Sequence, residues 1–292
     1  MISTSKSEII EDHPLYSIVK APVGTFLEMR APWHPDMNAA IVANNIKGID
    51  ISSEFAENLD FLYAFPQMEL LLLTLYHEVN CKAIHRLINL RNVSVIGNHQ
   101  IEADLSALSK LEDYTSYAGG PPKGIENCKA LRKLHIQGFK ASDLSILKDL
   151  TNLEFVRIDG GSLVSLGGIE NCHMLDMLWL SYQYKLSDIS AMEMLPSLRE
   201  IEMQSCKKVA TLRSFATLPK LKSLVLAGTG EMDTVRYFEG NTTLERFIFV
   251  EGSFVRDGDF SPLLAIPSLV DTSIQGKPHY LQSRRELRRD IV

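Results

Sequence analysis

One stretch of the sequence, from Leu153 to Ala227, repeats itself at a nearly fixed interval. The segments LEFVRIDG, LDMLWLSY, LREIEMQS and LKSLVLAG begin 22, 23 and 23 residues apart, at Leu153, Leu175, Leu198 and Leu221. Each segment carries apolar residues at its first, fourth and sixth positions. Because several positions recur in register, this repeat constrains the fold more strongly than any local propensity does.

The same register can be followed along most of the chain. The first apolar positions are Ile46, Leu70, Leu90, Leu111, Leu131, Leu153, Leu175, Leu198, Leu221, Leu244 and Leu269, which predict eleven strands. An L-x-x-L-x-L unit with a period in the low twenties is typical of a leucine-rich repeat solenoid. We therefore predict an α/β fold: a right-handed solenoid with a concave parallel β-sheet.

The segments between the predicted strands are too short for long helices. Pro196, Pro219 and Pro267 each stand two positions before the first leucine of the next strand. We therefore expect short helical or 3-10 turns on the convex side.

The chain resembles one branch of the leucine-rich repeat proteins. Repeats of 20 to 25 residues with S-D-I/L spacing, roughly from Ile46 to Gln275, are similar to the internalin-like, short-repeat class found in many bacteria. The asparagine of that class survives only as Asn98, with Cys206 as its usual substitute, so we expect glycines such as Gly97 and Gly160 to carry the bend after each strand.

The resemblance also implies a function. It points to a non-enzymatic protein-binding module, and most concretely to a bacterial cytoplasmic inhibitor, immunity-type or adaptor protein. Two alternatives stay open. One is a secreted effector that binds a host protein after export by a route other than Sec. The other is an enzyme or small-ligand receptor. Fold alone does not choose among them.

The repeats define the domain organisation, which we take to be one domain with two end caps. Residues 1–45 are predicted as an N-terminal cap with a β-hairpin over Tyr16–Ala21 and Thr25–Ala31, followed by a loop, APWHPDMN. The repeats fill residues 46–276, and residues 277–292 form a C-terminal cap or tail. This tail contains four arginines and is interpreted either as a helix that closes the last repeat or as a contact for an acidic partner.

Composition and charge argue against several classes of partner. A formal charge of -6 and a pI near 5.8 leave no basic footprint for nucleic acid. The N-terminus lacks the apolar core of a signal peptide, and the longest apolar run, Met68–Leu75, is too short to span a bilayer. We therefore expect a cytoplasmic monomer without membrane contact. The four cysteines show no C-x-x-C spacing and are predicted to be small buried apolar residues.

No catalytic, cofactor or metal motif is found. The eight histidines never occur at ligand spacing, and the sequence contains no phosphate-binding glycine loop and no G-x-S-x-G. Glu200 and Glu202 stand two apart on one predicted strand, at ~7 Å, a separation that could serve acid and base work on a glycoside. Adjacent carboxylates on a sheet face are usually solvated charge, so we predict no enzyme, no cofactor and no metal.

Strand alternation predicts where a partner would bind. The third, fifth and seventh positions of each unit point away from the core, and stacking aligns them in three columns on the concave face. Near the middle of the chain these columns bring aromatic and charged residues together. The predicted partner-binding residues are Phe155, Arg157, Met177, Trp179, Glu200, Glu202, His135 and Tyr117, with Tyr182 and Tyr184 in the following turn.

Two interpretations of this patch stay open. Exposed Trp179, Phe155 and Met177 would be an apolar liability unless a partner covers them, and such residues are enriched at interface centres. Alternatively, Trp179 only stacks on Arg157 of the neighbouring strand, as an exposed cation–π pair that contributes ~0.5 to 1 kcal/mol.

Overall fold

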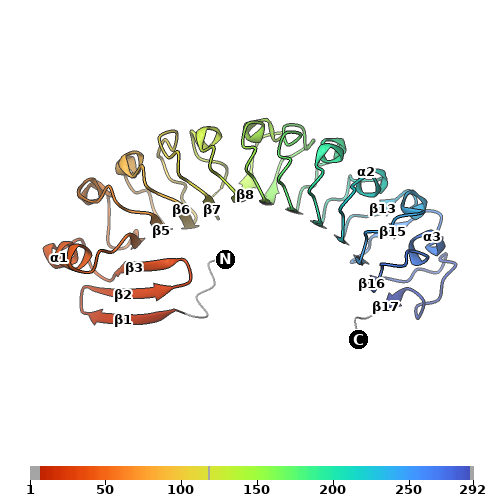
Figure 1. Cartoon of the computed structure of the whole chain (residues 1–292), viewed down its shortest axis with the longest axis horizontal. Helices are drawn as coiled ribbons and strands as arrows, with labels where there is room; N and C mark the ends of the chain where they lie inside the picture. The colour runs from red at the N-terminus through yellow and green to blue at the C-terminus, as the bar shows by residue number, and fades with distance from the viewer. Residues whose placement is uncertain (1–6, 118, 290–292) are drawn as a thin grey trace. The chain divides into compact units, whose positions relative to one another are not determined.

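The computed structural model describes residues 7–117 and 119–289 of the 292-residue chain. The chain divides into two compact units, residues 1–137 and 138–292. In each unit the strands of a parallel sheet lie on the inner side of the repeats, and short helical segments lie on the outer side (Figure 1). The predicted leucine-rich repeat solenoid is therefore confirmed.

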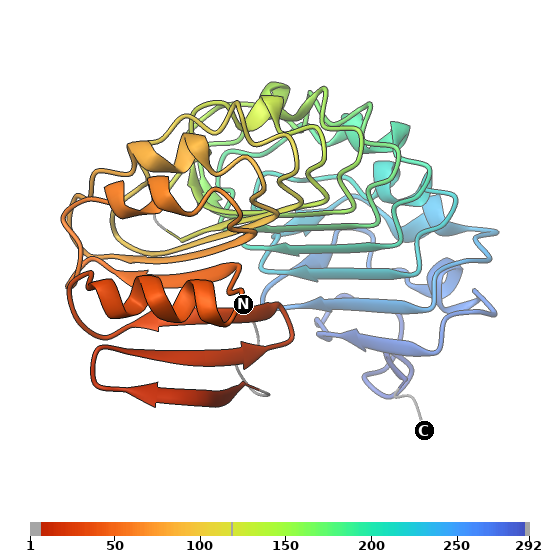
Figure 2. The same cartoon turned by 60° about the vertical axis from the view of Figure 1, so that its left-hand side comes forward.

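The first unit begins with three antiparallel strands, β1 (Glu8–His13), β2 (Tyr16–Ala21) and β3 (Gly24–Met29). Helix α1 (Pro35–Ala43) follows, and Figure 2 shows it beside these strands. From β3 onward the pairing is parallel. The repeat strands are β4 (Gly48–Ser52), β5 (Leu70–Leu75), β6 (Asn92–Gly97), β7 (Asp113–Ser116) and β8 (Lys133–Phe139), with 3-10 segments η1 (Asp60–Ala64), η2 (Lys82–Arg86) and η3 (Ile125–Asn127) between them.

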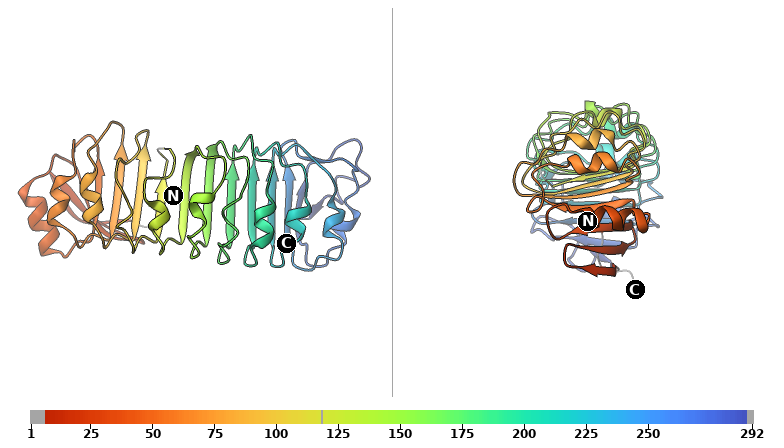
Figure 3. Two further views of the ribbon diagram at one scale, coloured as in Figure 1. Left: turned by 90° about the horizontal axis from the view of Figure 1, so that it is seen from above. Right: turned by 90° about the vertical axis from the view of Figure 1, so that its left-hand side faces the viewer.

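The second unit continues the same pattern, and its strands run side by side in Figure 3. Its main sheet contains β9 (Phe155–Gly161), β10 (Met177–Ser181), β11 (Glu200–Gln204), β12 (Ser223–Ala227), β14 (Arg246–Val250), β16 (Asp271–Ile274) and the antiparallel β17 (Arg288–Arg289). The connecting segments are η4 (Ser145–Leu147), η5 (Ser190–Met194), α2 (Arg213–Ala216), η6 (Val235–Phe238) and α3 (Ser261–Leu264), and β13 (Glu231–Met232) pairs with β15 (Phe254–Val255).

The core lies between the sheet and the helical turns. In the repeat that contains β9, the first, fourth and sixth apolar positions, Leu153, Val156 and Ile158, are all completely buried. A fully buried side chain of this size contributes about 1.5 to 3 kcal/mol relative to an exposed one. The period of the sequence thus places one apolar row per repeat in the core, and stacking joins these rows.

The register predicted for β5 is wrong by two residues. Gly48 pairs with Leu70, and Leu70 pairs with Asn92, so this repeat begins at the completely buried Met68 rather than at Leu70. The run from Met68 to Leu75 is apolar on both faces of the strand, so its alternation carries no register information. Leu70 instead lies on the inner face, where it packs with Val19 and Phe26 of the N-terminal strands.

Two further details at the N-terminus differ from expectation. Strand β1 was not predicted, and the segment expected to be a loop contains the start of α1. Pro35 opens this helix, which is compatible with proline because the first helical residues need no intrahelical N–H bond. The side chain of His34 accepts a hydrogen bond from the Asp36 backbone N–H.

The bend after each strand is not made by glycine alone. Gly97, Gly160 and Gly228 have positive φ, but so do Tyr182, Ser205 and Glu251 at the same step of their repeats. Polar side chains also bind backbone carbonyls one position later. Gln183 Nε2 donates to the Ile158 and Ser181 oxygens, and Cys206 Sγ lies 3.6 Å from the Leu180 oxygen. A ladder made by substitutes for asparagine therefore operates in the second unit.

The C-terminal tail contains no helix between residues 276 and 289, so the helical interpretation of this segment is wrong. β17 pairs with β16, and Leu287 is completely buried. The tail thus covers the edge of the last repeat strand as turns and a short strand, a device that removes an open sheet edge.

The four cysteines have the predicted role. All are buried and free, and burial raises the pKa of the Cys81 thiol to about 12 and that of the Cys206 thiol to about 11. They are unreactive apolar residues of the core.

Candidate functional site

The predicted patch in the second unit is assembled by three neighbouring strands, β9, β10 and β11. Phe155 pairs with Met177, and Met177 with Glu200; in the next row, Trp179 stands between Arg157 and Glu202. These registers follow the predicted columns, because the repeats from Leu153 to Leu244 keep their period within one residue. We call Phe155, Arg157, Met177, Trp179, Glu200 and Glu202 the aromatic patch.

Trp179 is held by its neighbours on both sides. The Phe155 ring meets it edge-on with centroids 5.1 Å apart, and the Arg157 guanidinium lies 5.7 Å from its ring centroid. Its indole Nε1 donates a hydrogen bond of 3.1 Å to Glu200 Oε1. Arg157 is itself oriented, because its Nε donates to Asp159 Oδ2 at 2.7 Å. The stacking on Arg157 that the sequence suggested is therefore present.

The aromatic patch is less exposed than expected. Phe155, Met177 and Trp179 are all half-buried. The packing within the patch covers part of its apolar surface, so exposure alone is a weaker argument for a partner than the sequence suggested. What the structure adds is rigidity, since each large side chain has a defined neighbour.

Tyr182 and Tyr184 directly follow β10 and are the exposed aromatic residues of this region. They are 44% and 55% exposed, and their ring centroids lie 6.3 Å apart. Tyr182 has a φ of +57°, a left-handed conformation that costs a residue with a side chain roughly 1 to 2 kcal/mol. A bulky aromatic residue thus occupies a turn position where other repeats have glycine.

Tyr117 and His135, the remaining predicted residues, lie in the first unit. Their ring centroids are 4.8 Å apart in an edge-on arrangement, and His135 is only 6% exposed. His135 therefore offers little surface to a partner.

The first unit contains a pocket that sequence reasoning missed. It has a volume of about 340 Å³ and lies on the inner face, between the N-terminal strands and β4 to β7. Its lining combines apolar side chains with two carboxylates and several hydroxyls. The residues that line it are Ser7, Ile9, Val19, Ala21, Phe26, Glu28, Asp50, Leu72, Leu73, Thr74, Ser94, Ile96, Thr115 and Tyr117.

Two carboxylates stand next to each other in this pocket. Glu28 of β3 and Asp50 of β4 are register partners, and Asp50 is followed in the same row by Leu72. Burial, together with the charge of Glu28, raises the pKa of Asp50 to about 6. The sequence did carry a signal, since Leu72 and Ile96 are apolar at outward positions, but the two-residue error at β5 separated Leu72 from Asp50.

We expect Asp50 to make the stability of the protein depend on pH. Its pKa is about 6 when folded and 3.8 as a free side chain, so the folded state holds the proton more tightly. The contribution of this group to stability is greatest below pH 4. It falls as the pH rises through 6, by about 3 kcal/mol in all. Asp50→Asn should therefore raise the free energy of unfolding above pH 6.

Urea unfolding of the wild type and of Asp50→Asn between pH 4 and 8 measures this effect. The two stability curves should converge at low pH and separate at high pH. Glu54→Gln, at an exposed carboxylate just after β4, is the matched control. Parallel curves for wild type and Asp50→Asn would contradict the expectation.

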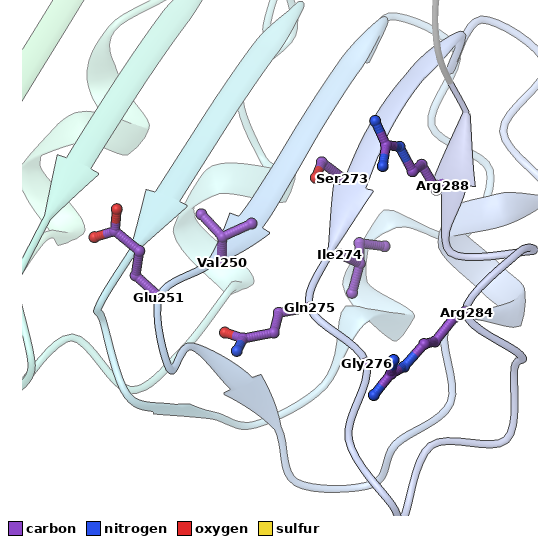
Figure 4. Close-up of a pocket in the computed structure, with 8 residues that line it drawn as sticks. All are labelled: Val250, Glu251, Ser273, Ile274, Gln275, Gly276, Arg284 and Arg288. Carbon is purple, nitrogen blue, oxygen red and sulfur yellow. The ribbon is translucent and has the colours of Figure 1, made fainter.

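A second pocket, of about 470 Å³, lies at the C-terminal end of the second unit (Figure 4). Arg284 and Arg288 of the tail line it together with Gln275 of the last repeat, whose Oε1 accepts a hydrogen bond from the Gly252 N–H. Glu251 lies on the opposite side. Two of the four tail arginines therefore face a shared hollow, as a contact for an acidic partner would require, although Glu251 reduces its positive charge.

The geometry gives no support to catalysis at Glu200 and Glu202. Glu200 accepts the hydrogen bond from Trp179, and both carboxylates lie on the half-buried face of a strand. In residues 7–117 and 119–289 no group of three or more His, Cys, Asp or Glu side chains is arranged to hold a metal ion. Over the same residues, no helix combines the length and the hydropathy needed to cross a bilayer.

Comparison with solved structures places this geometry in a known fold. An internalin from Listeria monocytogenes shares 16% identity with a TM-score of 0.51, over 80% of this chain and 63% of its own. A leucine-rich repeat protein from Leptospira interrogans shares 14% identity with a TM-score of 0.58, over 80% and 67%. The chain also matches the Drosophila Toll–Spätzle complex at 13% identity and a TM-score of 0.65, over 89% of this chain and 42% of that one.

These likenesses define the class: the protein has the leucine-rich repeat fold, of the type seen in internalins. It spans less than two thirds of the internalin chain and less than half of the Toll–Spätzle chain that it matches. No protein family model and no curated protein sequence matches it.

Proposed function

We propose that this protein is a non-enzymatic binding module that holds a protein partner on the inner face of its second unit, centred on the aromatic patch. The observation that carries the proposal is the fixed position of Trp179, which Phe155 and Arg157 contact from β9 and Glu200 contacts from β11. Tryptophan and arginine are enriched among the residues that dominate binding energy. A side chain already held in place loses less entropy on association.

The turn that follows β10 supports the same location. Tyr182 keeps an unfavourable backbone conformation while exposing its ring next to Tyr184. Ser205 and Glu251 share this conformation at the same step, so it belongs to the repeat turn; in this repeat the turn presents an aromatic ring. The two tyrosines would form the rim of the interface, and the aromatic patch its centre.

The class of partner is a protein. One structural neighbour is the Toll–Spätzle complex, so a protein with this repeat fold is found bound to a protein partner. In this chain we further propose a role as a bacterial cytoplasmic inhibitor, immunity-type or adaptor protein that acts as a monomer. Fractionation of the source cells tests the location, and detection mainly in the culture supernatant would favour a secreted effector instead.

Affinity capture from a lysate of the source cells tests the binding surface. The bait proteins are wild type, Phe155→Ala/Trp179→Ala and Tyr184→Ala, with Tyr63→Ala as control. Tyr63 is 49% exposed but belongs to η1, on the outer side of the first unit. We expect a partner retained by wild type and control to be reduced at least tenfold with the double variant, since loss of an anchor costs ~2 kcal/mol or more.

The four bait proteins must unfold at the same temperature for the comparison to hold. If the double variant is destabilised, Tyr184→Ala still tests the surface, because it changes only an exposed ring. Retention of the same partners at the same level by all four baits would show that the aromatic patch is not the binding site.

A further inference from the structure

We propose that the pocket of the first unit is a binding site for a small organic amine. The ammonium group would lie between Glu28 and Asp50, and the apolar body of the ligand would lie against Phe26, Leu72 and Ile96. This site is separate from the aromatic patch and does not depend on the protein-binding function proposed above.

The shape of the pocket suits a small ligand. Its volume of about 340 Å³ is at the lower end of the range for small-molecule sites. It exists because the N-terminal strands continue the sheet beyond the first repeat and place Val19 and Phe26 beside Leu70. Val19 and Phe26 are 7% and 8% exposed, so this wall is built from well-packed side chains.

The chemistry changes across the pocket along one row of the sheet. Glu28, Asp50, Leu72, Ser94 and Thr115 are successive register partners on β3 to β7. The row therefore begins with two carboxylates, continues with an apolar side chain and ends with hydroxyls. An amine with an apolar body matches the first three positions of this order.

In the part of the chain that the structure describes, no cationic side chain pairs with these two carboxylates, whereas similar groups elsewhere have such a partner. Glu69, directly before β5, accepts a hydrogen bond of 2.7 Å from Lys47. In the second unit, Asp271 pairs with Arg246 at 2.9 Å. Within the described residues, neither Glu28 nor Asp50 forms a salt bridge or a side-chain hydrogen bond, so the cation would come from the ligand.

Two neighbouring carboxylates beside an apolar wall are unfavourable on their own. Adjacent strands are about 4.8 Å apart, so the two negative charges repel each other, and the wall reduces their hydration. An ammonium group has three N–H donors and can bind both carboxylates at once, through hydrogen bonds strengthened by charge. Binding of an amine would therefore remove this repulsion.

Isothermal titration calorimetry with n-octylamine at neutral pH tests the proposal, with 1-octanol and octanoate as probes of the same length. The proteins are wild type, Asp50→Asn, Glu28→Gln and the control Glu54→Gln. We expect saturable binding of one n-octylamine, at least tenfold weaker in Asp50→Asn and Glu28→Gln and unchanged in Glu54→Gln. 1-Octanol should bind at least tenfold more weakly than the amine, and octanoate more weakly still.

Methyl NMR locates the ligand independently of the variants. The signals of Leu72 and Ile96 should shift on addition of n-octylamine to the wild type, while those of Leu224 and Val225 in the second unit should not. No saturable binding, equal affinity for 1-octanol, or unchanged binding in both carboxamide variants would each overturn the proposal.

Discussion

Gly161→Ala is expected to lower the free energy of unfolding by more than about 3 kcal/mol, whereas Gly160→Ala should cost only about 1 kcal/mol. Gly161 has a φ of +144°, and an added Cβ would lie 2.2 Å from the backbone oxygen of Phe139. That oxygen belongs to the preceding repeat, so this clash can be relieved only if the two repeats move apart. Gly160 has a φ of +68°, and its Cβ would meet nothing within 4 Å.

Urea unfolding of the two variants measures this difference, and Gly160→Ala is the internal control because it is the adjacent residue in the same turn. Its cost reflects the left-handed conformation alone, whereas that of Gly161→Ala adds a backbone clash. Equal losses for the two variants would show that the repeats at this turn are not packed as closely as the structure places them.

Phe249→Ala is expected to lower the free energy of unfolding by about 3 to 5 kcal/mol. Phe249 is completely buried in the second unit, with its ring centroid 5.7 Å from that of Phe247 and 6.2 Å from that of Phe260. Removal of the ring leaves a cavity among aromatic neighbours that cannot collapse without disturbing two repeats. Stacking contacts between these rings are lost as well.

The control for this variant is Ile248→Ala. Ile248 precedes Phe249 on β14 but points to the inner face and is only half-buried, so its truncation should cost about 1 kcal/mol. Chemical denaturation of both variants, with m-values compared, measures the effect. Similar losses at the two positions would contradict the assignment of inner and core faces on this strand.

Periodicity was sufficient to predict the fold and the face on which each residue of the second unit lies. From Leu153 to Leu244 the leucine period varies by only one residue, so Phe155, Met177 and Glu200 could be aligned correctly from the sequence. The alignment failed at β5, where Leu70, Leu71, Leu72 and Leu73 are apolar in succession. There the register is set by packing against Val19 and Phe26, which are distant in the sequence.

The sites were predicted only in part, for a related reason. Alternation places Trp179 beside Arg157, but it does not show that Phe155 and Glu200 also contact the ring. The first-unit pocket depends on the correct pairing of Asp50 with Leu72, and this was lost with the register of β5. The left-handed conformation of Tyr182 was not predicted, because a bulky side chain rarely adopts a positive φ.

Site-specific photo-cross-linking tests the proposed binding face most directly. A benzoylphenylalanine is placed at Tyr184 in one protein and at Met194 in another. These residues are 55% and 60% exposed; Tyr184 lies in the turn after β10, next to the aromatic patch, and Met194 in η5 on the outer side. On irradiation with the captured partner, we predict a covalent adduct from position 184 and none from position 194. An adduct from position 194 alone would place the partner on the outer helical side and contradict binding through the inner face.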